Sequence, residues 1–213
     1  MVYAIKNKII QESFVGKLIS IVGASGVGKT ALVHALAKNK IFQTAYEQHA
    51  ERPFQALFKQ DKRFALANQI DYLLLRAEQE KDLRRNTAQI GLIDGGLDLD
   101  FHGFTRLFRS RNLLDQPEFD LCRRLYTHIR ETLPQPELIV SLHADLETVN
   151  SRMVSRQRIN IASAEDTALF NSFLDEWLVD ISSAQKLELD VTDETLDYQH
   201  SATSILEFIE KHF

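Results

Sequence analysis

The chain has 213 residues, of which 44% are hydrophobic, and a formal net charge of −5. This length and apolar content suffice for the buried core of a single domain over residues 1–213. The weak negative charge argues against a nucleic-acid-binding protein, and no apolar run reaches the roughly 18 residues that span a bilayer. The single cysteine, Cys122, excludes an internal disulfide and fits a reducing compartment, so we expect a cytoplasmic protein without a membrane or nucleic-acid partner.

Short apolar runs alternate with longer amphipathic stretches along the chain. The runs predict five strands, at 17–22, 41–47, 88–94, 137–143 and 186–191. The stretches predict helices at 29–39, 61–85, 98–113 and 118–133, from 145, and at 164–184 and 198–212. This alternation is typical of a parallel sheet covered on both faces. We therefore predict an α/β fold with a five-stranded parallel sheet that binds ligands beyond the carboxyl ends of its strands.

A phosphate-binding motif follows the first predicted strand. The sequence GASGVGKT has the P-loop spacing G-x-x-x-x-G-K-[ST]. Its glycines allow backbone N–H groups to turn toward an anion, and the next helix points its positive end at the same place. Lys29 would reach the β- and γ-phosphates, and Thr30 would offer its hydroxyl to Mg²⁺. We expect nucleotide binding by Gly23, Ala24, Ser25, Gly26, Val27, Gly28, Lys29 and Thr30.

Two carboxylates end predicted strands at the same sheet edge. Asp94 closes the third strand, where P-loop proteins place a second acid for Mg²⁺. Glu47 closes the second strand, where a carboxylate can accept the proton of an attacking hydroxyl. A turn residue is the structural alternative for Asp94, and a solvated strand end is the alternative for Glu47.

Further polar side chains recur at helical spacing. Gln69 and Arg76 are seven residues apart and share one helix face, where they offer the donors and the acceptor that a nucleobase edge needs. The stretch SRMVSRQR brings Arg152, Arg156 and Arg158 close together, and such arginines can stabilise charge that develops on a transferred phosphoryl group. The structural alternatives are a polar helix margin and a solvated charge run.

From about Leu18 to the C-terminus these motifs resemble the deoxynucleoside kinase family. YEQHAERPF resembles the family's YEEPVDDNPF, and this implies that Glu47 is the catalytic glutamate. KRFALANQIDYLLLR resembles KRYAFHLQIYFLNKR, and LIDGGLDLD falls on DRSIYED. The resemblance implies that Gln69, Arg76 and Asp100 read the base.

The same resemblance extends to the arginine-rich stretch. PELIVSLHADLETVNSRMVSRQR resembles the family's PDLIIYL…CLERIKKRGR, which implies that Arg156 and Arg158 belong to a lid at about 155–163. It also implies a P-loop NTPase three-layer fold and a homodimer formed through the helices that follow strands two and three.

Several positions depart from the family pattern. Gly95 and Gly96 replace an Arg-Ser pair, so the arginine expected near the reacting phosphate is missing; Arg52 and Arg106 are candidate replacements. Phe58 stands where many members have a tyrosine that holds the sugar 3′-hydroxyl, so its substrate contact would lack that hydroxyl. The lid's Glu-Glu pair and the proline after the catalytic glutamate are also absent.

The resemblance implies ATP- and Mg²⁺-dependent phosphorylation of the 5′-hydroxyl of a (deoxy)nucleoside, as in nucleotide salvage. Two alternatives stay open: a P-loop kinase with another small acceptor, such as a nucleoside monophosphate, and a catalytically weakened nucleotide-binding relative. A GTPase is disfavoured because SLHAD stands after the fourth strand, where the guanine-reading N-K-x-D motif would be expected.

Overall fold

A five-stranded sheet forms the centre of the molecule. The computed structural model describes residues 16–46, 51–155, 164–195 and 197–213. The strands are β1 (Leu18–Val22), β2 (Phe42–Ala45), β3 (Ile90–Asp94), β4 (Leu138–His143) and β5 (Lys186–Asp190). They are all parallel and lie in the order β2-β3-β1-β4-β5. The predicted parallel sheet is confirmed, and each strand begins and ends within two residues of its expected limits.

The central strand explains why these runs are apolar without alternation. β1 lies between β3 and β4, with Ile19 opposite Leu92 on one side and Leu138 on the other. Every residue of β1 is buried because helices cover both faces of the sheet. A strand in that position buries successive side chains on opposite faces, so all of them are apolar or hydrogen-bonded.

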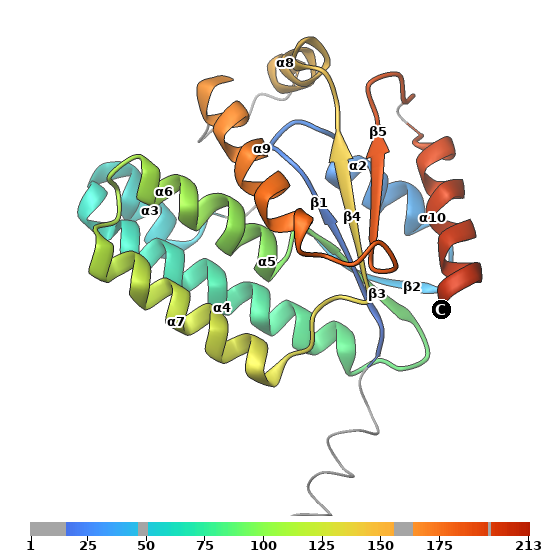
Figure 1. The fold of residues 1–213 in the computed structure, drawn as a ribbon, viewed down its shortest axis with the longest axis horizontal. Helices are drawn as coiled ribbons and strands as arrows, with labels where there is room; N and C mark the ends of the chain where they lie inside the picture. The colour runs from blue at the N-terminus through green and yellow to red at the C-terminus, as the bar shows by residue number, and fades with distance from the viewer. Residues whose placement is uncertain (1–15, 47–50, 156–163, 196) are drawn as a thin grey trace, which may run out of the picture.

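The helices form two layers around the sheet (Figure 1). The elements are α2 (Lys29–Leu36), α3 (Pro53–Gln60), the 3₁₀ turn η1 (Lys62–Phe64), α4 (Ala65–Arg84), α5 (Leu97–Leu99), the π-helix η2 (Asp100–Thr105), α6 (Arg106–Ser110), α7 (Gln116–Thr132), α8 (Leu146–Ser155), α9 (Ala164–Val179) and α10 (Gln199–His212). Helices α2 and α10 pack on one face, whereas α4, α7 and α9 lie on the other side (Figure 1). The expected three-layer arrangement is therefore present.

Two local features differ from the sequence-based prediction. Helix α3 was not expected; it begins at Pro53, a residue that suits the first turn of a helix. The helix expected at 98–113 is divided, because residues 100–105 widen into a π-helix between α5 and α6. Widened turns of this kind are rare and occur often at functional sites.

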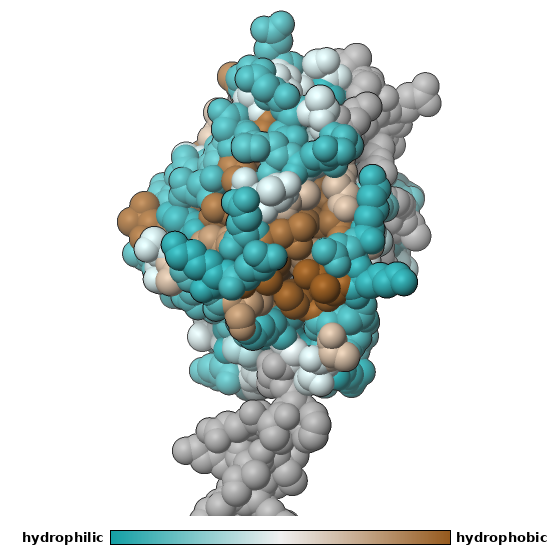
Figure 2. Space-filling model, turned by 90° about the vertical axis from the view of Figure 1, so that its right-hand side faces the viewer, coloured by the Kyte–Doolittle hydropathy of each residue, from teal (hydrophilic) through white to brown (hydrophobic). Residues whose placement is uncertain are grey.

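The surface on the side of α2 and α10 carries an apolar area ringed by polar side chains (Figure 2). A shallow depression between these helices is lined by Ala35, Leu36, Ala202 and Leu206, with two lysines at its margin. Ile41, which precedes β2, is 39% exposed. Apolar side chains thus reach the surface at this side of the sheet. In the part of the chain that the structure describes, no helix is long and apolar enough to cross a membrane.

Candidate active site

The P-loop connects β1 to α2 at the carboxyl edge of the sheet. Gly23, Gly26 and Gly28 all have positive φ angles, of 140°, 84° and 122°, which side-chain-bearing residues rarely adopt. The Lys29 ammonium folds back over the loop and donates to the carbonyl oxygens of Gly23 and Ala24, at 2.9 and 3.0 Å. The glycines thus have the left-handed conformations that the motif requires, and the loop lies at the N-terminus of α2, where a helix favours an anion.

Asp94 lies beside the P-loop because β3 is the neighbour of β1 and Asp94 is in register with Ile21. The Thr30 hydroxyl donates to Asp94 Oδ2 at 2.5 Å. Asp94 is 1% exposed, and its buried Oδ1 has no hydrogen-bond partner among the residues described. A buried carboxylate oxygen without a donor costs free energy unless a cation or ligand satisfies it. The pair therefore fits an Mg²⁺ ion, for which oxygen atoms are the preferred ligands.

The turn after β3 depends on Gly95 and Gly96. Their φ angles are 88° and 106°, so the Arg-Ser pair of the family would be strained in this conformation. The Gly95 carbonyl accepts from the Ser20 hydroxyl at 2.5 Å, and its amide donates to the Ile21 carbonyl at 2.9 Å. A Cβ at Gly95 would lie 3.6 Å from Arg76 Nη2. The Arg76 guanidinium thus packs beside the position where the family's arginine side chain begins.

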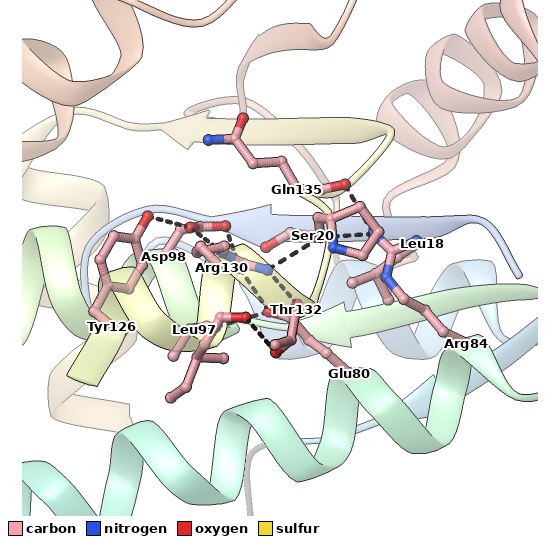
Figure 3. Close-up of polar contacts among 12 residues, drawn as sticks. Leu18, Ser20, Glu80, Arg84, Leu97, Asp98, Tyr126, Arg130, Thr132 and Gln135 are labelled. Atoms are coloured by element: carbon pink, nitrogen blue, oxygen red, sulfur yellow. Dashed lines mark hydrogen bonds and ion pairs between the residues drawn. The ribbon is translucent and has the colours of Figure 1, made fainter. Parts of the chain in front are cut away.

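A buried ionic cluster fixes this turn against two helices (Figure 3). Arg130 on α7 donates to both oxygens of Glu80 on α4, at 2.7 and 3.0 Å, and to both oxygens of Asp98 on α5, at 2.7 and 3.0 Å. Glu80 also accepts from the Leu97 amide at 3.1 Å, and the Tyr126 hydroxyl donates to Asp98 at 2.7 Å. Burial raises the pKa of Glu80 although Arg130 opposes this shift. Burial lowers the pKa of Arg130, but the two carboxylates more than reverse the shift.

The three predicted base-reading residues lie close together between α4 and the π-helix. Gln69 and Arg76 project from the same face of α4, and Asp100 begins the π-helix. Arg76 Nε donates to Asp100 Oδ2 at 2.7 Å, and the Thr105 hydroxyl donates to Gln69 Oε1 at 3.0 Å. Arg76 also reaches the Asp94 carbonyl, at 3.3 Å. The structure therefore connects this group with the strand end that carries the P-loop acid.

Phe58 is packed in the core, and the two arginines that could replace the family's arginine both form ion pairs. Phe58, on α3, is 5% exposed and packs on Phe108 with ring centroids 5.0 Å apart. Arg52 forms a bidentate ion pair with Asp71, at 2.5 and 2.6 Å. Arg106 pairs with Glu176 and stacks over Phe173. Either arginine would have to leave a carboxylate partner before it could approach a phosphate.

Three predicted catalytic residues, Glu47, Arg156 and Arg158, lie outside the described residues, as does the lid beyond residue 155. The residue before Glu47 is anchored, because Gln79 on α4 donates to the Tyr46 carbonyl at 3.2 Å. Arg152, the first arginine of the SRMVSRQR stretch, lies within the described residues and donates to the carbonyls of Val27 and Val191, both at 2.8 Å. Arg152 therefore connects the P-loop to the end of β5, a structural role that its spacing from Arg156 does not reveal.

Two side chains near the site were missed by sequence reasoning. Tyr198, just before α10, is 2% exposed, and its hydroxyl lies so close to Gly28 that a Cβ there would be 1.9 Å away. Thr105 contacts Gln69 from the π-helix. Neither residue belongs to a motif. Tyr198 reaches the P-loop because the segment before α10 packs against it, and Thr105 reaches Gln69 because of the π-helix.

His102, in the π-helix, is packed among aromatic rings. It stacks on Trp177 with ring centroids 4.9 Å apart, and its Nε2 lies 3.2 Å from the Tyr126 hydroxyl. Burial, opposed by Asp98 and reinforced by Arg106 and Arg130, lowers the pKa of His102 to about 4.

This shift predicts a pH-dependent stability. The unfolded chain takes up a proton on His102 near the ordinary pKa of about 6.5, whereas the folded protein resists it down to about pH 4. The free energy of unfolding should therefore fall by about 2 kcal/mol more between pH 7 and pH 5 in the wild type than in His102→Gln. Urea denaturation at both pH values measures the free energy of unfolding of each protein. An equal fall of this free energy between pH 7 and pH 5 in the two proteins would contradict the prediction.

The fold and the loop at its carboxyl edge define a P-loop nucleotide-binding protein. A family model described as deoxynucleoside kinase matches residues 19–213. The chain therefore belongs to the deoxynucleoside kinase family, as its motifs predicted.

Individual relatives are more distant. The deoxyadenosine/deoxycytidine kinase of Bacillus subtilis is 26% identical over 149 residues, which are 66% of this chain and 66% of that protein. The deoxyadenosine kinase of Dictyostelium discoideum is 26% identical over 156 residues, 73% of this chain and 63% of the relative. The matched segments thus span about two thirds of these relatives' lengths.

The fold is also that of a solved structure. Deoxyadenosine kinase from M. mycoides, with the products dCMP and dCDP bound, has a TM-score of 0.76 at 20% identity, covering 91% of this chain and 99% of that one. The same enzyme with bound dATP has a TM-score of 0.74 at 21% identity. The predicted fold class is confirmed by this likeness.

Proposed function

We propose that this protein transfers the γ-phosphoryl group of ATP to the 5′-hydroxyl of a (deoxy)nucleoside and releases the nucleoside 5′-monophosphate. One observation carries the proposal: the P-loop and Asp94 share a sheet edge with the Gln69, Arg76 and Asp100 group, through the bond from Arg76 to the Asp94 carbonyl. The proposed phosphate site and the proposed base-reading site would thus be joined at one strand end. Membership of the deoxynucleoside kinase family supports the same reaction.

The phosphate end of the proposed site comes from the P-loop. Backbone amides of Gly23 to Thr30 would hold the phosphates, and Lys29 would leave its two carbonyl partners to reach the β- and γ-phosphates. Thr30 and Asp94 would hold Mg²⁺, a role supported by the unsatisfied Asp94 Oδ1. The chemistry that such an ion supplies is neutralisation of the charge on the phosphates.

The reacting groups are proposed from the family motifs. Glu47 would accept the proton of the 5′-hydroxyl as it attacks, and Arg156 and Arg158 would stabilise the charge on the transferred group. These arginines belong to the lid proposed at about 155–163, within a single domain over residues 1–213.

The acceptor end would hold the base through Gln69, Arg76 and Asp100. Amide, guanidinium and carboxylate groups together supply donors and acceptors for a nucleobase edge. Phe58 would contribute an apolar wall, because it has no hydroxyl to offer a sugar. The curated relatives are named for deoxyadenosine, deoxycytidine and deoxyguanosine, which supports a purine or cytosine nucleoside as the acceptor.

A homodimer through the helices that follow β2 and β3 is part of the proposal. Large apolar side chains are exposed on these helices: Phe54 and Leu57 on α3, Leu74 on α4 and Leu121 on α7. Light scattering should give about twice the chain mass of 24.4 kDa. A monomer at micromolar concentration would exclude this interface. A cytoplasmic location, expected from the single cysteine, remains a prediction.

A catalytically weakened relative is the second candidate. The observation that favours it is that Arg52 and Arg106, which could replace the missing family arginine, are both engaged with carboxylates. Product analysis separates the candidates: radiolabelled ATP and Mg²⁺ are supplied with each nucleoside and each nucleoside monophosphate. A labelled 5′-monophosphate supports the proposal, a labelled diphosphate indicates a monophosphate acceptor, and no labelled product supports the weakened relative.

A further inference from the structure

The π-helix is connected to α4 by two side-chain contacts at the proposed base-reading group. Asp100 accepts from Arg76 at 2.7 Å, and Thr105, at the other end of the π-helix, lies 3.0 Å from Gln69 Oε1. The carbonyl oxygen of Asp100, five residues earlier, also lies 3.0 Å from the Thr105 hydroxyl, so the single hydroxyl proton is shared between this carbonyl and Gln69 Oε1. Thr105 is fully buried, so its position is set by packing and not by solvent.

The contact with Thr105 occupies one end of the Gln69 amide. An amide has a donor end and an acceptor end of almost the same shape, and only its hydrogen bonds decide which way it faces. Here Oε1 is held by the Thr105 hydroxyl. Gln69 Nε2 donates to no acceptor among the described residues, and it is not completely buried. The amide nitrogen is thus available to a ligand.

We propose that Thr105 is a positioning residue that fixes the orientation of the Gln69 amide and thereby sets which nucleobases the site accepts. The inference rests on the proposed function, in which Gln69 faces the base. With Oε1 held at Thr105, Gln69 presents an N–H donor and the second lone pair of Oε1.

This arrangement matches a base edge that pairs a ring-nitrogen acceptor with an amino donor. Adenine and cytosine have such an edge, whereas guanine and thymine place an N–H beside a carbonyl. Without the Thr105 hydroxyl the amide can turn over by 180° and match the second pattern as well. The Thr105 hydroxyl should therefore favour adenine and cytosine nucleosides over guanine and thymine nucleosides.

The experiment compares Thr105→Val, which keeps the volume and loses the hydroxyl, with Thr105→Ser, which keeps the hydroxyl. For each protein, kcat and KM are measured with deoxyadenosine, deoxycytidine, deoxyguanosine and thymidine. In Thr105→Val the ratio of kcat/KM between the two pairs of nucleosides should fall about fivefold to tenfold, the usual worth of one hydrogen bond. The change should come through the nucleoside KM, with the KM for ATP unchanged, and Thr105→Ser should keep the wild-type ratio.

An unchanged ratio in Thr105→Val would overturn the proposal, as would a loss in Thr105→Ser as large as that in Thr105→Val. A second readout does not depend on activity: the side-chain amide NMR signals of Gln69 in the substrate-free protein, assigned with Gln69→Leu. These signals should shift in Thr105→Val and stay in place in Thr105→Ser. If they respond in this way while no nucleoside is phosphorylated, the proposed function fails and the positioning role stands. If they do not move, the positioning role fails even in an active enzyme.

Discussion

Replacing Glu47 by glutamine should lower kcat by about 10²–10⁴-fold, the usual contribution of a positioned general base. The amide keeps the size of the side chain and its ability to form hydrogen bonds, but it cannot accept the proton of the attacking 5′-hydroxyl. Binding of ATP should be almost unchanged, because the proposed phosphate site is the P-loop and does not include Glu47. Steady-state kinetics with a saturating nucleoside, together with calorimetric titration of ATP, measure both quantities.

The chain offers a matched control for this substitution. Glu51 is close in sequence, and its side chain is 47% exposed and paired with Lys59 at 2.5 Å. Glu51→Gln makes the same chemical change outside the proposed site, so its kcat should stay within about twofold of the wild type. A Glu47→Gln enzyme that is as active as the Glu51→Gln enzyme would remove Glu47 from the mechanism.

Replacing Arg130 by leucine should destabilise the folded protein by about 3–5 kcal/mol, the usual cost of removing one partner from a buried ion pair. Arg130 satisfies both Glu80, which is fully buried, and Asp98, which is 2% exposed. Without the guanidinium, two carboxylates remain close together in a region from which water is excluded. Urea denaturation at pH 7 measures the loss of stability, which for a chain of this length corresponds to a fall of about 6–20 °C in Tm.

Arg123→Leu is the control for the loss of an arginine on the same helix. The Arg123 side chain is 59% exposed, and its pair with Asp120 is a surface contact one helical turn away. Its removal should change the free energy of unfolding by at most about 0.5 kcal/mol. Similar effects of the two substitutions would show that the Glu80, Asp98 and Arg130 cluster does not stabilise the fold.

The sheet and the P-loop could be predicted from the sequence because both depend on local patterns. A strand buried on both faces must be an almost continuous apolar run, as LISIV is in β1, where the one polar residue, Ser20, is hydrogen-bonded. The P-loop needs glycines at positions with positive φ, and glycines can be recognised directly in the sequence. The same kind of motif placed Asp94 beside Thr30, since a parallel sheet aligns the ends of its strands.

Other features depend on partners that are distant in the sequence. Helix α3 carries Phe54, Leu57 and Phe58 at helical spacing, and of these three Phe58 alone is buried. The helix has only 8 residues, which is shorter than the window of roughly 11 residues or more over which helical periodicity can be recognised. Arg152 forms its bonds with carbonyls 125 and 39 residues away, which no local pattern encodes. The π-helix changes the backbone spacing without a change in composition, and so the contact between Thr105 and Gln69 could be found only in the structure.

The most direct test of the proposed reaction is the release of ADP from ATP and Mg²⁺ with each common deoxyribonucleoside and ribonucleoside supplied in turn. Lys29→Ala serves as the control for contaminating activity, because Lys29 belongs to the proposed phosphate site. The proposed function predicts ADP release that one or a few nucleosides stimulate strongly and that Lys29→Ala abolishes. ATP binding without stimulation by any nucleoside would contradict the proposal and would favour another acceptor or a protein that binds nucleotides without turnover.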